Sequence, residues 1–108
     1  MSIGDLLTFA NYHLEGLRGF VAMMKPATFE VLHKPVGDEK YGCGWMITDQ
    51  FCPDPYHGHN GSDGTFRAEM ALWPEKSIAI VSIMNAGSIT EPSPALQAVM
   101  AVYERYRR

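Results

Sequence analysis

The segment of residues 57–87 constrains the fold most, because it holds three strand-like runs joined by two tight connections. Its last run, Ile78–Met84, reads IAIVSIM, which is apolar at nearly every position and rich in β-branched residues. Such a run is typical of a strand that is covered on both faces. We therefore expect this strand in the middle of a sheet.

The run before it alternates in character. Its apolar residues recur at every second position, at Phe66, Ala68, Met70 and Leu72. The residues between them are polar, at Thr65, Arg67 and Glu69. This period of two predicts a half-buried strand.

Two connections make these runs an antiparallel meander. Pro74 has no amide hydrogen and a fixed φ, so the ladder stops there and the chain reverses. The sequence Ser62-Asp63-Gly64 supplies turn chemistry after a third run, Tyr56–Ser62. That run is rich in glycine, which allows a ligand or another backbone to approach closely.

Helices are predicted at both ends of the chain. Ser2 and Asp5 form a capping-box-like start for a first helix that ends at Gly16 or Gly19. A short helical turn over residues 27–32 follows Pro26. Ser93 and Pro94 begin a final helix. Its apolar face is expected at Leu96, Val99, Met100, Tyr103 and Tyr106.

Residues 41–48 predict one short extra strand, and the prolines at 53 and 55 predict a loop over residues 49–56. The expected fold class is therefore α+β. An antiparallel sheet, made of a three-stranded meander plus a short extra strand, packs with N- and C-terminal helices that cover the same sheet. Residues 1–108 fit a single domain with a small core.

Charge and hydropathy exclude some partners. The net charge is −3, and basic residues cluster only in the last four positions, which argues against nucleic-acid or membrane-surface binding. No apolar run reaches the roughly 18 residues of a membrane-spanning helix, and no signal peptide is visible in this chain. The sequence does not predict the cellular compartment of the protein.

Histidines and cysteines raise the question of a metal site. His57 and His59 share one face of their strand, and Cys43 and Cys52 lie upstream. The spacing matches no common closed zinc site, so we expect no metal and no other cofactor. The two cysteines are expected to be free buried thiols, although the sequence also allows a disulfide between them. His13 is the one histidine on the predicted first helix, and we expect it to be a structural or solvated residue.

Several motifs occur in a recognisable order. His59-Asn60-Gly61-Ser62 is followed by Gly64, Phe66 and a hairpin that turns at Trp73-Pro74-Glu75-Lys76. Upstream lies Tyr41-Gly42-Cys43-Gly44-Trp45. Over about residues 2–105 the chain resembles the C-terminal third of the serine β-lactamase and penicillin-binding-protein superfamily, closest to its class C and esterase branch. His59-Asn60-Gly61 stands where that family usually has Lys-Thr-Gly.

The resemblance implies a substrate-binding or oxyanion wall at His59, Asn60, Gly61 and Ser62. His59 would supply polarity or charge, Gly61 would leave space for the substrate, and the Ser62 amide would provide half of an oxyanion hole. The family acts through Ser-x-x-Lys and Tyr-x-Asn motifs. Neither occurs in this chain, so no complete catalytic set is present.

The leading hypothesis is a C-terminal segment of a serine-hydrolase-like protein, inactive alone toward β-lactams, esters or peptides. Its expected partner is a second copy of the chain or a missing N-terminal portion of the same enzyme. The alternative is a non-enzymatic module for self-association or partner binding. Within the motif, His59 rather than His57 is expected to face the ligand.

Overall fold

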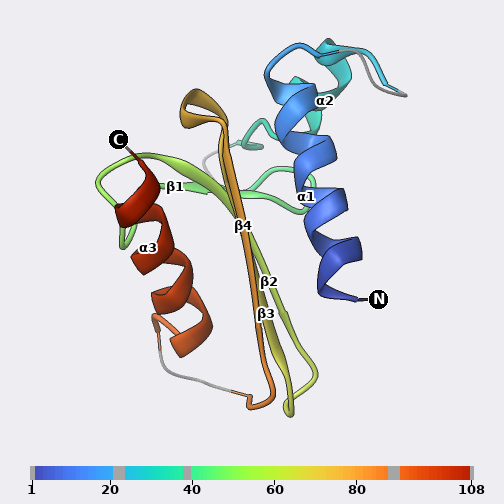
Figure 1. Cartoon of the computed structure of the whole chain (residues 1–108). Helices are drawn as coiled ribbons and strands as arrows, with labels where there is room; N and C mark the ends of the chain where they lie inside the picture. The colour runs from blue at the N-terminus through green and yellow to red at the C-terminus, as the bar shows by residue number, and fades with distance from the viewer. Residues whose placement is uncertain (1, 21–23, 38–39, 88–90, 108) are drawn as a thin grey trace.

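The computed structural model describes residues 2–20, 24–37, 40–87 and 91–107. In these ranges the elements follow one another as α1 (Ile3–Leu17), α2 (Pro26–Leu32), β1 (Met46–Thr48), β2 (Tyr56–Ser62), β3 (Arg67–Trp73), a 3₁₀ turn (Pro74–Lys76), β4 (Ile78–Met84) and α3 (Pro94–Tyr106). The strands form one antiparallel sheet in the order β1-β2-β3-β4, and α1 and α3 lie on opposite sides of it (Figure 1). The α+β class is confirmed.

Helix α1 begins at the predicted capping box. The Ser2 hydroxyl accepts a hydrogen bond from the Asp5 amide, and the Asp5 carboxylate accepts one from the Ser2 amide. Gly19, with φ of +88°, follows the end of the helix. The apolar stripe of α1 covers one face of the sheet through Ala10 and Leu14, which pack with Leu72. None of the helices in the described ranges is long and apolar enough to span a bilayer.

Helix α3 covers the other face of the sheet. Ser93 caps it by accepting a hydrogen bond from the Leu96 amide at 3.1 Å. Val99 and Tyr103 are buried, and the Tyr103 ring stacks on Trp73 with 3.9 Å between ring centroids. Tyr106 was expected on the same buried face, but it is 63% exposed in the last helical turn.

The prediction that Ile78–Met84 is a central strand is wrong. Among the described strands, β4 pairs only with β3 and forms an edge of the sheet. It is nevertheless covered by helices on both faces, because α1 packs against Ala79 and Val81 while α3 packs against Ile78 and Ile80. Its continuous apolar run therefore reflects two covered faces, and carries no information on whether both edges are paired.

The polar alternation of β3 also misled the prediction of a half-buried strand. Arg67 and Glu69 are 7% and 3% exposed, because their face of β3 lies under α3 and its N-terminal approach. The central strand is thus β3, buried on both faces. Phe66, predicted on the apolar face, precedes the strand and is 53% exposed.

Residues 41–48 form less strand than expected. Only Met46–Thr48 pairs with β2, while the preceding residues form a tight turn closed by a 2.7 Å hydrogen bond from the Gly42 amide to the Trp45 carbonyl. Gly44 has φ of +89°, a conformation that glycine adopts readily and that reverses the chain. The glycines therefore build a turn where alternation suggested a strand.

Candidate functional site

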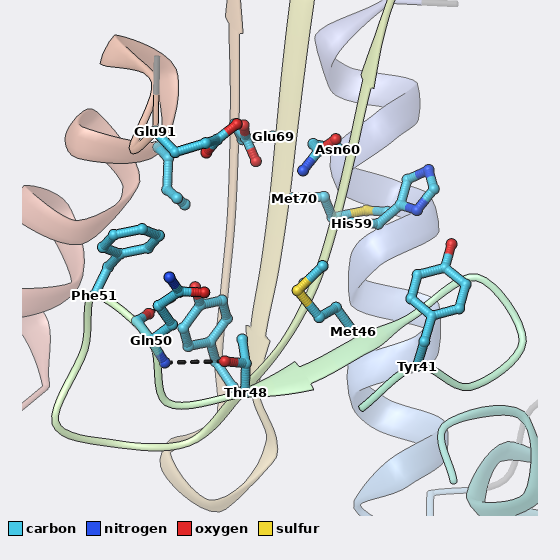
Figure 2. A pocket seen from close by; sticks show the side chains of 13 residues that line it. Tyr41, Met46, Thr48, Gln50, Phe51, His59, Asn60, Glu69, Met70 and Glu91 are labelled. Atoms are coloured by element: carbon cyan, nitrogen blue, oxygen red, sulfur yellow. Dashed lines mark hydrogen bonds between the residues drawn. The ribbon is translucent and has the colours of Figure 1, made fainter. Parts of the chain in front are cut away.

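A cavity of about 280 Å³ lies beside the outer edge of β2, at the point where β1 ends. The short β1 pairs only with Tyr56, His57 and Gly58, so no described strand pairs with the later residues of β2 on that side. The cavity is lined by Tyr41, Met46, Thr48, Gln50, Phe51, Tyr56, Gly58, His59, Asn60, Glu69, Met70, Glu91 and Leu96. Figure 2 shows Phe51 on one side of it, and His59 and Tyr41 on the other.

The ladder fixes which backbone amides face this open edge. The Ile47 amide donates to the Lys40 carbonyl at 2.8 Å, and therefore points away from β2. Amides alternate in direction along an antiparallel strand, so Met46 and Thr48 point toward β2, and Gly58 points back toward β1. Continuing the alternation along β2, the amides of Asn60 and Ser62 point to the unpaired edge.

The structure brings together part of the predicted motif. His59 and Asn60 line the cavity and are exposed. Gly61 and Ser62 lie outside the lining, and an added Cβ at Gly61 would meet no atom within 4 Å. The Ser62 hydroxyl is occupied in the hairpin turn, where it donates to the Phe66 carbonyl at 2.6 Å. Only the amide of Ser62 is therefore directed to the edge.

One end of the cavity carries two carboxylates that sequence reasoning missed. Glu69 accepts hydrogen bonds from Arg67 Nε at 2.9 Å and from Ser93 Oγ at 3.0 Å. Glu91 accepts one from Arg67 Nη2 at 2.8 Å. Figure 2 shows both carboxylates at the same end, with Asn60 nearby. The available signal was the Asn60–Glu69 cross-strand pair, which requires the register to be known.

His57 is engaged elsewhere. Its Nδ1 lies 2.9 Å from Nδ1 of His33, and His33 Nε2 lies 2.8 Å from Nδ1 of His13. These residues come from β2, the end of α2, and α1, so three segments meet in one histidine chain. The His33 ring also stacks on Trp45, with ring centroids 4.5 Å apart. His13 is buried in this histidine chain, so it has the structural role that was one of the two expected for it.

Burial keeps this histidine chain uncharged near neutral pH. Desolvation, together with the nearby His57 and His13, lowers the pKa of His33 to about 3. Burial also lowers the pKa of His13 and that of His57. His57 is therefore a half-buried member of the histidine chain that holds β2, while His59 is exposed and lines the cavity.

The cysteines do not join the histidines. Cys43 is an exposed free thiol on the turn before β1, and Cys52 is a buried free thiol packed beneath α3. The expectation that both are buried is wrong for Cys43, because the turn carries it to the surface. Within the described ranges, no group of three or more histidine, cysteine or acidic side chains is arranged to hold a metal ion.

Comparison with known proteins gives no relative. No protein-family model, no curated protein and no solved structure matches this chain.

Proposed function

We propose that the chain supplies one wall of a β-lactamase-like serine hydrolase, and binds part of an ester or amide substrate in the cavity beside β2. The nucleophile would come from outside this chain, because none of its serines is followed by lysine three positions later. His59 contributes a polar side chain to the cavity, and the Ser62 amide contributes a donor for the developing oxyanion.

The observation that carries this proposal is the open half-edge of β2. Preorganised backbone donors stabilise an oxyanion best when they are held rigidly and have no competing partner. The amides of Asn60 and Ser62 meet this condition, because β3 fixes their strand on one side and no described strand pairs on the other. The cavity lies against the same edge.

The proposal predicts that the isolated chain is inert. Incubation with a fluorescent penicillin or a fluorophosphonate should leave the intact mass unchanged, because an unactivated serine is a weak nucleophile near neutral pH. When co-expressed with an upstream coding region that contains Ser-x-x-Lys and Tyr-x-Asn, the chain should complete an esterase. His59→Ala should then reduce turnover about 10²-fold, and His57→Ala should change the turnover of the folded fraction little.

Equal losses at the two histidines would show that the motif is misplaced on β2. A stoichiometric adduct on the isolated chain would contradict the need for an external nucleophile. A reading frame upstream without either motif would favour the alternative, a non-enzymatic module.

The alternative, self-association, is favoured by one observation, the free edge of β4. By the same alternation, the amides of Ala79, Val81 and Ile83 point away from β3 and have no described partner. The strand contains no charge and no proline, the usual devices against edge pairing. A second copy of β4 fits this edge in antiparallel pairing, because an uncharged run brings no repulsion against itself.

The large aromatic rings of the core offer little surface for self-association. Trp45, Trp73 and Tyr103 are buried, whereas Phe51 is 42% exposed. The edge rather than an apolar face is therefore the basis for pairing.

We expect the chain to form dimers at micromolar concentration, and Ile83→Lys to shift it to monomers. Ile83 is 43% exposed and sits on the free strand, so a lysine there adds a charge to the edge without entering the core. Val31→Lys, on the exposed side of α2, is the matched control. Light scattering after size exclusion measures the mass. A wild-type monomer at every concentration would contradict pairing through β4.

A further inference from the structure

One oxygen of a carboxylate at the end of the cavity accepts no hydrogen bond from the described residues. The Glu69 side chain is 4% exposed and lines the cavity. Its Oε1 accepts both of the hydrogen bonds from Arg67 and Ser93, whereas Oε2 takes none from the residues that the structure describes. Among the described residues, Trp73 Nε1 is the one fully buried side-chain polar atom without a partner, so Oε2 is not fully buried and stays accessible. Oε2 is therefore placed to accept a hydrogen bond from a ligand.

The charge around this atom is negative. Glu69 and Glu91 share the guanidinium of Arg67, so two carboxylates face one cation among the described groups. Among the described residues, none that lines the cavity is a lysine or arginine. A site that binds a carboxylate ligand normally presents such a cation. This end of the cavity has the opposite character and attracts a positively charged group.

The rest of the cavity is apolar and aromatic. Phe51, Tyr41 and Tyr56 contribute rings, and three aliphatic or thioether side chains contribute further apolar surface, at Met46, Met70 and Leu96. Aromatic faces attract ammonium groups and also pack on apolar ligand groups. A volume near 280 Å³ suits a small ligand.

We propose that the cavity binds a small primary ammonium ligand with an aromatic group, its ammonium donating to Glu69 Oε2 beside Glu91, and that it rejects carboxylates. This rests on the proposed function, which makes the cavity the substrate wall. It specifies that the part of the substrate held by this chain carries an amine. An ammonium fits better than a neutral alcohol, because it offers three donors and a charge to the same two carboxylates.

The test compares three probes of similar size: 2-phenylethylammonium, 2-phenylethanol and phenylacetate. Each is titrated at pH 7 into the isolated ¹⁵N-labelled chain, and amide chemical shifts are followed. We expect the ammonium probe to shift the amides of Asn60, Ser62 and Met70 saturably, with an affinity about tenfold above that of the alcohol, a difference of about 1.4 kcal/mol. Phenylacetate should produce no saturable shift of these amides.

Glu91→Gln is the informative variant. Its side chain is 52% exposed, so the change removes a charge without burying a new group. It should weaken ammonium binding about fivefold, within the range of a partly exposed charge pair. Glu75→Gln, an exposed change of the same charge in the 3₁₀ turn, should leave binding unchanged. An equal loss in both variants would show that only the net charge of the chain matters.

Two results would overturn the inference. Binding of phenylacetate as tightly as the ammonium would contradict the charge selection, while leaving the cavity as a ligand site and the proposed function standing. No saturable shift with any probe would contradict ligand binding here. The proposed function is decided separately, by turnover after co-expression with the upstream region.

Discussion

Replacing Arg67 with methionine should lower the free energy of unfolding by about 3–5 kcal/mol, the range for breaking a buried ion pair from one side. Methionine keeps much of the apolar volume but removes the guanidinium that holds both Glu69 and Glu91. The Glu69 carboxylate would then remain buried with only the Ser93 hydroxyl as donor. Urea unfolding at pH 7, followed by tryptophan fluorescence, measures the loss.

Two further variants separate the buried pair from a general charge effect. The double variant Arg67→Met with Glu69→Met should recover most of the lost stability, because no buried charge is left unpaired. Arg105→Met, an exposed arginine on α3, should change stability by less than about 0.5 kcal/mol. A loss below about 1 kcal/mol for Arg67→Met alone would show that water enters the pair.

The stability of the protein should also fall as the pH decreases below 6.5. The pKa of His33 is about 3 in the folded state against 6.5 for an ordinary histidine. The unfolded chain therefore binds more protons across this window, and the contribution of His33 is full above pH 6.5 and lost progressively toward pH 3. At pH 5 the loss amounts to about 2 kcal/mol, at roughly 1.4 kcal/mol per pKa unit.

The lowered pKa values of His13 and His57 act in the same direction. Urea midpoints measured between pH 7 and pH 5 show the slope before most carboxylates titrate. His33→Gln should flatten this slope, because the most strongly shifted group no longer titrates. His59→Gln, an exposed control, should leave it unchanged. A slope that is the same in His33→Gln and in the unmodified chain would contradict the histidine chain as its source.

Local patterns were sufficient for most of the elements. The capping box at Ser2, the proline at the start of α3 and the Ser62-Asp63-Gly64 turn each act through neighbouring residues, and each appears in the structure where it was expected. Hydrophobic periodicity was a weaker guide to which faces of the strands are buried and which strands form the edges of the sheet. In the sequence, Arg67 and Glu69 have the pattern of solvent-facing residues. In the fold, Glu91 and Ser93, which precede α3, contact them.

The candidate site was predictable in part for the same reason. His59 and Asn60 belong to a local motif, but their place at the open edge depends on where β1 stops pairing with β2. Glu91 lies 22 residues after Glu69 in the sequence, and no local spacing predicts its ion pair with Arg67 beside the cavity. The histidine chain depends on three elements that meet only in the folded state. Contacts of this type require the tertiary arrangement, which sequence periods do not encode.

The histidine chain also has a direction. A neutral imidazole carries one N–H, so His33 donates to one neighbour and accepts from the other. The third proton of the trio then resides on Nε2 of His13 or on Nε2 of His57, and the two arrangements have opposite dipoles. Exchanging them reverses every donor and acceptor along the chain while the rings stay in place. The hydrogen-bonded link between α1 and β2 therefore has two tautomeric arrangements. In one of them Nε2 of His57 carries no proton, and in the other Nε2 of His13 carries none.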